Sequence, residues 1–197
     1  MIIPIWIPDN PSAKIWFTSD QHYSHQNIIK FCNRPYADTH TMNKALTEGY
    51  NSLVEDNDYV FHLGDLSFAD KKSTRTIIAG LKGHKILIRG NHDREPDGFY
   101  LANGFKEIYS NCLLTLPTGG LALLNHKPEE LPSLCDKLMA GGALIEGQIC
   151  GHIHQRWKTD YESANTGEVF GITVNVGVDV QNFMPVSISD VLRQMGL

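Results

Sequence analysis

Three features of the sequence predict an α/β fold that carries a metal site at the ends of its strands. Short apolar runs, rich in β-branched and aromatic residues, alternate with longer segments of helical periodicity. Each of five such runs is followed by residues that can bind a metal ion. Loops at the carboxyl ends of strands are where α/β sheets bind ligands. The five runs are residues 15–17, 59–61, 86–88, 121–124 and 149–150.

The motifs that follow these runs contain Asp, Asn and His. In chain order they are Asp20-Gln21-His22, Gly64-Asp65, Gly90-Asn91-His92-Asp93, Asn125-His126 and Gly151-His152-Ile153-His154. Glycine precedes the candidate ligands in three of the five motifs, where it allows a sharp turn or a close approach without a Cβ clash. Packing needs alone would hardly produce five such motifs, so the series predicts one shared site.

Taken singly, each motif has an ordinary structural explanation. Asp20 is compatible with a helix N-cap, with His22 at the surface. The glycine, asparagine and aspartate of residues 90–93 all favour turns. His152 and His154 share one face of a strand, as exposed histidine pairs also do. The metal site is favoured because the five motifs occur together.

The segments between the apolar runs have the spacing of amphipathic helices. We expect helices over residues 24–31, about 41–54, and 72–81. Proline and glycine interrupt residues 128–142, which predicts a loop with one short helix near residues 133–139.

The two ends of the chain are expected to be ordered as well. Residues 1–8 are apolar but contain two prolines, which predicts an extended arm or an edge strand and is too short to span a bilayer. A strand is expected over residues 171–176. The last helix is expected to run from Ser189, a plausible N-cap, to Met195.

Composition indicates an ordinary globular protein, which we interpret as a single domain over residues 1–197. Its hydrophobic fraction is 42% and its charged fraction 20%. The net charge of −5 argues against extended nucleic-acid binding, which needs many basic contacts to phosphate. The four cysteines form no paired spacing, which is typical of reduced thiols in a cytoplasmic protein. No membrane partner is expected.

The ligand types indicate the kind of ion. Carboxylate, imidazole and amide oxygen without thiolate suit Mn best, with Fe, Zn or Ni compatible. Two divalent ions about 3.5 to 4 Å apart need a bridging ligand, and a carboxylate with two anionic oxygens suits that role. We expect Asp65 to be this bridge. Such a pair lowers the pKa of a shared water from about 15.7 to about 7, so that hydroxide can be the nucleophile.

The motif series resembles the calcineurin-like metallophosphoesterases. Their pattern of D-x-H, G-D, G-N-H-[DE], H and G-H-x-H occurs in the same order from Asp20 to His154. Four further sequence segments resemble those of the small bacterial and phage members of this family: residues 22–25, 31–35, 62–65 and 175–179. The resemblance implies a four-layer α/β/β/α sandwich of two mixed sheets, with a dinuclear metal site at strand ends.

The resemblance also implies two ligand sets that share Asp65. One ion would be bound by Asp20, His22, Asp65 and His154, and the other by Asp65, Asn91, His126 and His152. His92 would be the general acid above the leaving group, and Asp93 would orient it.

Other polar residues have less specific patterns. His25 and Arg34 follow the first motif, where imidazole or guanidinium could contact a substrate phosphate; His25 is equally compatible with the first turn of a helix. Asn175 and Asp179 could orient metal ligands or form a turn. We interpret three histidines without a motif partner as surface residues or as surroundings of the site: His40, His62 and His84.

The function that the resemblance implies is metal-dependent hydrolysis of a small phosphodiester or phosphomonoester, with metal-bound hydroxide as nucleophile. One alternative is a metal-dependent nuclease acting on DNA or RNA, which the absence of a capping domain and of a basic surface disfavours. Another is a non-catalytic, metal-free binding module, which the complete ligand set disfavours. The sequence leaves open the physiological substrate, the preference for diester or monoester, the native metal, the oligomeric state and the biological source.

Overall fold

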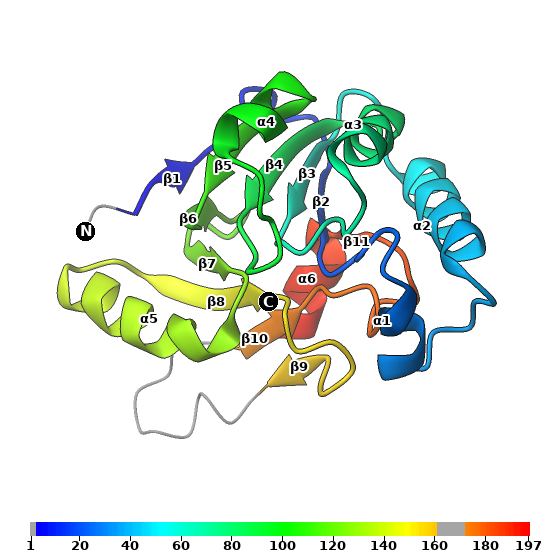
Figure 1. The fold of residues 1–197 in the computed structure, drawn as a ribbon. Coiled ribbons are helices and arrows are strands. Elements are labelled where there is room, and N and C mark those ends of the chain that lie inside the picture. The colour runs from blue at the N-terminus through cyan, green and yellow to red at the C-terminus, as the bar shows by residue number, and fades with distance from the viewer. Residues whose placement is uncertain (1–2, 161–171) are drawn as a thin grey trace.

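Two β-sheets packed face to face form the centre of the molecule, and helices cover their outer faces (Figure 1). This computed structural model describes residues 3–160 and 172–197. The five-stranded sheet has the order β11 (Val186–Ser187), β2 (Ile15–Thr18), β3 (Tyr59–His62), β4 (His84–Ile88), β5 (Phe105–Tyr109). The six-stranded sheet has the order β1 (Ile5–Trp6), β6 (Asn111–Thr115), β7 (Leu121–Asn125), β8 (Ile145–Cys150), β10 (Ile172–Asn175), β9 (Thr159–Asp160).

Both sheets are mixed, as the sequence predicted. In the five-stranded sheet, β2, β3, β4 and β5 are parallel and only β11 is antiparallel to its neighbour. In the six-stranded sheet, β7, β8 and β10 are parallel neighbours and β1 is parallel to β6, while β6 is antiparallel to β7 and β9 is antiparallel to β10. The carboxyl ends of the parallel strands therefore meet at common edges, which is the arrangement that the five motifs required.

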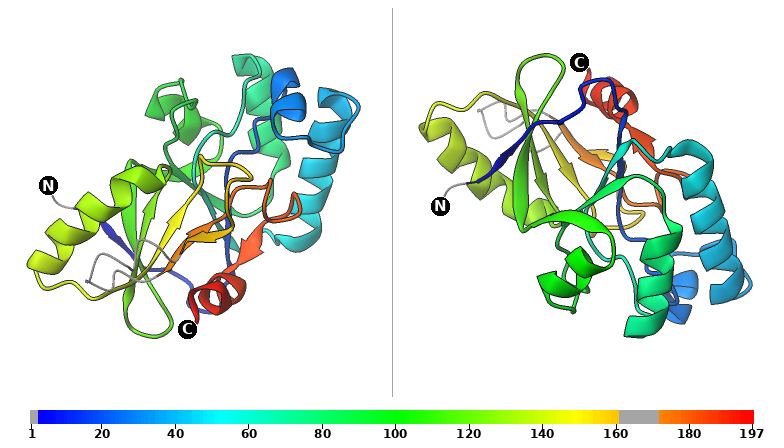
Figure 2. Two further views of the ribbon diagram at one scale, coloured as in Figure 1. Left: turned by 90° about the horizontal axis from the view of Figure 1, so that it is seen from below. Right: turned by 90° about the horizontal axis from the view of Figure 1, so that it is seen from above.

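Helices form the two outer layers. Those described are α1 (Gln26–Phe31), α2 (Thr39–Leu53), α3 (Lys71–Gly80), α4 (Asp97–Ala102), the 3₁₀ turn η1 (Pro128–Glu130), α5 (Leu131–Ala140) and α6 (Ile188–Met195). Figure 2 shows α5 on one side of the two sheets and α2 and α3 on the other. The predicted four-layer sandwich is confirmed. None of the helices in the described ranges has the length and apolar character needed to cross a membrane.

The strand sequences divide their side chains between two cores. In β3, Phe61 belongs to the core between the sheets and Val60 to the core beneath α2 and α3. In β7, Leu124 faces the inter-sheet core and Leu123 packs with α5 residues such as Cys135. The period of two that places neighbours on opposite faces explains why these runs are apolar throughout.

The helix limits differ from the predicted ones where capping was misjudged. Asp38 and Asp70 cap α2 and α3, so these helices begin at Thr39 and Lys71. The last helix begins at Ile188 and not after Ser189, because the Ser187 hydroxyl accepts a hydrogen bond from the Asp190 N–H. The short helix predicted near residues 133–139 is present as α5, which begins earlier, at Leu131, since a proline within its first turn does not interrupt it.

Several elements were not predicted at all: α4, β5, β6, β9, β11 and the turn η1. β5 is the edge of its sheet and mixes charged with apolar residues, so it shows no long apolar run. The N-terminal segment was expected to be an arm or an edge strand, and β1 is indeed the edge strand of the six-stranded sheet, with Trp6 buried. The predicted strand at residues 171–176 corresponds to β10, and residue 171 lies outside the described residues.

Candidate metal centre

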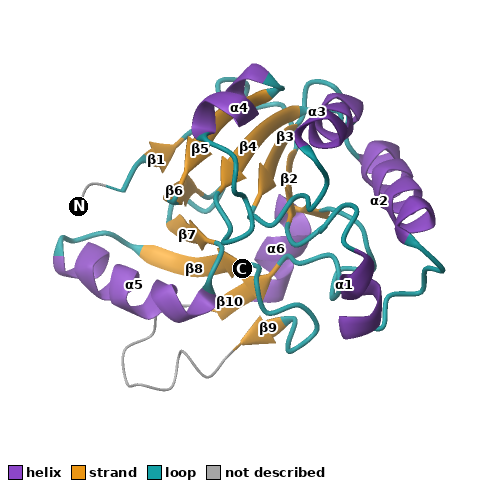
Figure 3. Cartoon of the chain, viewed as in Figure 1, coloured by secondary structure: helices purple, strands orange, loops and turns teal. Residues whose placement is uncertain are grey.

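Five loops meet at the carboxyl ends of β2, β3, β4, β7 and β8, and Figure 3 shows these teal segments gathered between the two sheets. Backbone hydrogen bonds join them: the Asp20 N–H donates to Gly64 O at 3.0 Å, and the Gly151 N–H donates to His126 O at 3.0 Å. The loops therefore form one continuous structure, and the side chains that they carry face a common space.

Most of the candidate ligands have strained backbone conformations. The φ angle is positive at Asp20 (58°), His22 (49°), Asp65 (56°), His152 (73°) and His154 (50°). Positive φ is uncommon for residues other than glycine and costs free energy, so surrounding contacts must enforce it. Such outliers concentrate at functional sites.

The glycines of the motifs permit close contact between the loops. A Cβ at Gly64, whose φ is 90°, would lie 2.5 Å from the Gly90 backbone. A Cβ at Gly151 would lie 2.0 Å from Ser19 Oγ and 2.5 Å from an Asp20 carboxylate oxygen. The sequence-based interpretation that these glycines allow close approach is confirmed.

Two groups of candidate ligands lie side by side. We define position one as Asp20, His22 and His154, and position two as Asn91, His126 and His152. In position one the three ligand atoms lie within 4.8 Å of one another, and the same is true of Asp65, His126 and His152. Asn91 Oδ1 lies 3.1 Å from His126 Nε2.

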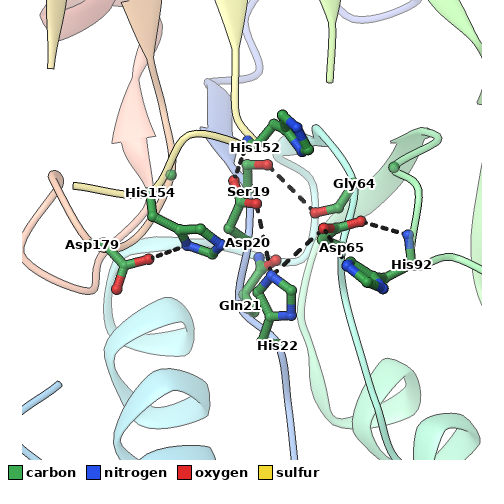
Figure 4. Close-up of polar contacts among 12 residues, drawn as sticks. Ser19, Asp20, Gln21, His22, Gly64, Asp65, His92, His152, His154 and Asp179 are labelled. Atoms are coloured by element: carbon green, nitrogen blue, oxygen red, sulfur yellow. Dashed lines mark hydrogen bonds and ion pairs between the residues drawn. The ribbon is translucent and has the colours of Figure 1, made fainter. Parts of the chain in front are cut away.

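Asp65 stands between the two positions. Its Oδ2 atom is 3.5 Å from His22 Nε2 and 3.5 Å from His126 Nε2. Its Oδ1 atom accepts a hydrogen bond from the His92 N–H at 2.8 Å, as Figure 4 shows. One carboxylate oxygen therefore faces both groups equally, which is the placement expected of a bridging ligand.

Position one contains buried polar atoms that need a partner. Asp20 Oδ1, His22 Nδ1 and His22 Nε2 are buried and have no hydrogen-bond partner among residues 3–160 and 172–197. A buried polar atom without a hydrogen-bond partner lowers the stability of the folded protein. The donor set of imidazole and carboxylate suits a divalent ion of the Mn, Fe or Zn type. The residues present therefore fit a metal ion.

A buried ion pair holds His154 in place. Its Nδ1 donates to Asp179 Oδ2 at 2.8 Å, which leaves Nε2 free to face Asp20 (Figure 4). Burial lowers the pKa of His154, but the hydrogen bond to Asp179 outweighs it and raises the pKa to about 10. Asn175 holds the same loop, because its side chain donates to His154 O at 2.8 Å. Both roles considered for this pair are seen: Asp179 and Asn175 orient a candidate ligand and its loop, and Asn175 Oδ1 also accepts a hydrogen bond from the Gly177 N–H at 2.9 Å in a turn.

Arg34 lies beneath the site and not in it. Its Nε and Nη2 donate to the Asp179 carboxylate at 2.8 and 3.0 Å. The remaining N–H groups donate to Asp20 O at 2.7 Å, Gln21 O at 2.8 Å and Met42 Sδ at 3.5 Å. All five donors are used and the side chain is buried. The expectation that Arg34 contacts substrate is therefore wrong: it orders the first motif and Asp179.

In position two, His126 is held by a backbone carbonyl, and the other two candidate ligands are more exposed. The His126 Nδ1–H donates to Leu63 O at 2.6 Å, so Nε2 faces Asp65. Burial lowers the pKa of His126, yet the hydrogen bond and charge of Asp65 raise it to about 9. The side chain of His152 is 33% exposed, and its Nε2 lies 3.8 Å from a Glu129 carboxylate oxygen. Asn91 is exposed.

His92 and Asp93 do not form the expected pair. The side chain of His92 is 35% exposed at the rim, with Nε2 4.0 Å from Asp65 Oδ2. Asp93 points into the protein instead, where its oxygens accept hydrogen bonds from the N–H groups of Asp65 (3.0 Å), Leu66 (3.1 Å) and Gly90 (2.8 Å). Neighbouring side chains in this turn diverge, so the prediction that Asp93 orients His92 is wrong. Asp93 holds the second and third motifs together.

The other two histidines near the site differ in burial. His25 precedes α1 and its ring stacks on Phe68, with centroids 3.9 Å apart. His62 is fully buried, so of the two interpretations considered for it, surroundings of the site is the one seen and surface residue is not. Its ring nitrogens lie 3.3 Å from Gln21 Nε2 and 3.4 Å from Tyr50 Oη, in the wall behind position one.

Known proteins are similar to this chain in sequence and in fold. An uncharacterized protein of Methanocaldococcus jannaschii, MJ1445, is 33% identical over 185 residues, which cover 91% of this chain and 90% of that protein. The gene 66 protein of Mycobacterium phage D29 is 31% identical over 163 residues, 73% of this chain and 80% of that protein. The crystal structure of AQ665, a protein of unknown function from Aquifex aeolicus, has a TM-score of 0.70 at 24% identity, over 92% of this chain and 99% of that one.

A family assignment agrees with the motif order and the sandwich. Residues 13–137 match the calcineurin-like phosphoesterase family, and this range includes every candidate ligand except His152 and His154. Those two histidines complete the groups around Asp20 and Asp65 from outside the matched range. The chain belongs to the calcineurin-like phosphoesterase family.

Proposed function

We propose that this protein is a hydrolase of small phosphate esters, either diesters or monoesters, that uses two divalent metal ions. The observation that carries the proposal is the placement of Asp65 Oδ2, 3.5 Å from both His22 Nε2 and His126 Nε2. The family supports the reaction class, since its members are generally metal-dependent phosphoesterases. The partly exposed His92 and His152 leave the centre open to a ligand from solvent.

The two ions, when bound, would offset the charge of the phosphate and lower the pKa of a water molecule between them. Position one and position two would hold one ion each, and Asp65 would contact both. The ligands mix carboxylate and amide oxygen with imidazole, which supports Mn first, with Fe, Zn or Ni compatible.

His92 is proposed to donate a proton to the leaving oxygen. Its side chain is 35% exposed at the rim, with Nε2 4.0 Å from Asp65 Oδ2. Burial lowers the pKa of His92, and the Asp65 charge opposes this effect. A negatively charged phosphate beside the ring would favour its protonated form further.

The leaving group tests this role. His92→Asn should lose about 10² to 10⁴-fold in kcat on an alkyl ester, because a departing alkoxide needs a proton. The same variant should retain most of its activity on a p-nitrophenyl ester, whose leaving group departs without one. Equal losses on both esters, with two ions still bound, would contradict the acid role.

A small substrate fits the charge of the chain. The sequence has 17 Lys and Arg against 22 Asp and Glu, so a basic surface for long nucleic acid is not supported. The four unpaired cysteines support a reducing compartment, which we take to be the cytoplasm.

The test of the reaction is a screen of metal-reconstituted protein. Candidate substrates are p-nitrophenyl phosphate, bis(p-nitrophenyl) phosphate, cyclic nucleotides and pyrophosphates. We expect turnover of at least one ester with Mn, and none by metal-free protein or by Asp65→Asn. If elemental analysis found two ions but no ester were cleaved, the proposed reaction would be wrong. A folded, reconstituted protein that binds no metal would instead indicate the non-catalytic module.

A further inference from the structure

Two hollows flank the metal centre on opposite sides. The first, of about 230 Å³, lies beside His92, and its lining includes Phe68, Thr74, His92, Arg94, Glu95 and Tyr100. The second, of about 260 Å³, lies beside His152 and His154 and is lined also by Ile28, Phe31, Gln155 and Arg156. We call them the His92 hollow and the Phe31 hollow. Each has an aromatic ring and an arginine in its wall.

A row of four rings connects the hollows. The Phe31 ring stands edge-on to His25 at 6.5 Å, and His25 stacks on Phe68 at 3.9 Å with an interplanar angle of 13°. Phe68 in turn contacts His92 at 4.7 Å. The rings of His25, Phe68 and His92 all lie within 5.6 Å of the His22 ring, so the row passes directly along position one.

Phe31 is unusual within this row because its side chain is not needed for packing. It is 68% exposed, whereas Ile28 and Ile29 of the same helix are 3% and 8% exposed and provide the contact of α1 with the core. The helix would therefore be anchored without Phe31. An exposed aromatic ring beside a hollow that opens onto candidate metal ligands is suited to stacking on a planar group.

Arginines add positive charge at both ends of the row. The Arg94 guanidinium carbon lies 5.9 Å from the Phe68 ring centroid, and Arg156 lines the Phe31 hollow. Both residues are exposed. The His92 hollow also contains Glu95, which is paired with Lys71 at 2.8 Å. Two hollows beside one phosphate site, each with an aromatic ring and an arginine, match a substrate with two substituents on phosphorus, since a monoester would fill only one of them.

We infer that the substrate is a phosphodiester whose two arms occupy the two hollows, and that Phe31 stacks on an aromatic retained arm. The inference rests on the proposed function. Water would add its oxygen to phosphorus and release a proton, while the bond from phosphorus to the arm in the His92 hollow breaks. The departing oxygen takes a proton, so the products are an alcohol and a phosphomonoester that keeps the arm beside Phe31.

Two esters with the same leaving group but different retained arms test the contact between the retained arm and Phe31. Phenyl p-nitrophenyl phosphate and methyl p-nitrophenyl phosphate both release p-nitrophenolate and differ only in the arm assigned to Phe31. Phe31→Ala should raise KM for the phenyl ester about two- to tenfold, the range expected for one aromatic contact. KM for the methyl ester and kcat for both should stay within about twofold. Phe31→Tyr should restore the phenyl preference.

Leu144→Ala is the matched control, because Leu144 is also 68% exposed and lines neither hollow. It should leave both esters unchanged. Equal effects of Phe31→Ala on the two esters, or none on either, would overturn the assignment of the retained arm.

Binding separates this inference from the proposed reaction. Calorimetry with diphenyl phosphate and dimethyl phosphate on Mn-loaded protein needs no turnover. Diphenyl phosphate should bind more tightly to the wild type, and Phe31→Ala should remove that preference. If the wild type cleaved no ester but showed this pattern, the reaction would be wrong and the two-arm site supported. Equal affinity for the two phosphates in the wild type would overturn the two-arm site whatever the activity.

Discussion

Position one and position two use similar residues but differ in how firmly the protein holds them. Asp20 and His22 have exposed side-chain fractions of 0% and 2%, and His154, which is 23% exposed, is held by the buried Asp179. In position two only His126 is comparably buried, because His152 is 33% exposed and Asn91 is exposed. Position one is built into the protein, and position two opens to solvent.

This difference has a consequence for the order of metal binding. Ligands that are already fixed lose little conformational freedom when an ion binds, so position one should bind its ion more tightly. The more exposed ligands of position two are accessible to a phosphate from solvent. We therefore expect an ion in position two to exchange more readily than an ion in position one.

Replacing Asp65, the ligand shared by the two positions, should abolish the difference in metal affinity between them. This is the largest effect that we expect. Asp65→Asn keeps the shape of the side chain but removes the negative charge that faces both His22 and His126. Both ions should be lost and activity should fall to background. Elemental analysis and ester hydrolysis check this, with the exposed Asp97→Asn as control. A variant that keeps two ions at wild-type affinity would show that Asp65 is not the bridge.

The next effect concerns the support of position one. Arg34→Met leaves Asp179 buried without its guanidinium partner, which should lower the free energy of unfolding by about 3 to 5 kcal/mol. The matched variant Arg193→Met breaks an exposed pair with Asp190 and should cost at most about 1 kcal/mol. Urea unfolding of the metal-free proteins measures both. Similar small losses in the two variants would mean that the Arg34 and Asp179 pair does not stabilise the site.

Substitution of one ligand at a time should distinguish metal binding at position one from metal binding at position two. His152→Ala should weaken only the second, weaker Mn binding step, whereas His22→Ala should weaken the first step by at least about tenfold. Calorimetric titration with Mn distinguishes the steps. If His152→Ala weakened the tighter step and His22→Ala the weaker one, the proposed order of affinity would be reversed.

The sequence was sufficient for the ligand loops because each is a local feature. An apolar run followed by glycine and a polar ligand specifies both the strand and its end, and the parallel order of the strands then brings the ends together. The strands at β2, β3, β4, β7 and β8 were located for this reason. Elements at sheet edges, such as β5, lack the apolar run because one side of an edge strand is not buried.

The direction of a side chain could not be predicted in the same way. Asp93 follows His92 directly in sequence and Arg34 lies in the segment after the first motif, and both were assigned to the site. The structure turns each toward the backbone of neighbouring loops, where unsatisfied N–H or C=O groups need partners. That need arises only once segments far apart in sequence are packed together. His62 illustrates the same limit, since one polar residue at the end of an apolar strand gives no sign of which core it enters.

His62 provides an effect that is absent at neutral pH, in the wall behind position one. Burial lowers its pKa to about 3, with Lys85 contributing. An unfolded chain binds the proton near the ordinary value of about 6.5, so the contribution of His62 to stability is complete above that pH. The free energy of unfolding should therefore fall by about 1 kcal/mol per pH unit as pH decreases from about 6.5 toward about 3. Urea unfolding of metal-free His62→Gln should show a shallower decline over this range than the wild type. Exposed His40→Gln should leave the decline unchanged. If His62→Gln and wild type declined in parallel, the buried ring would not be the group that couples stability behind position one to pH.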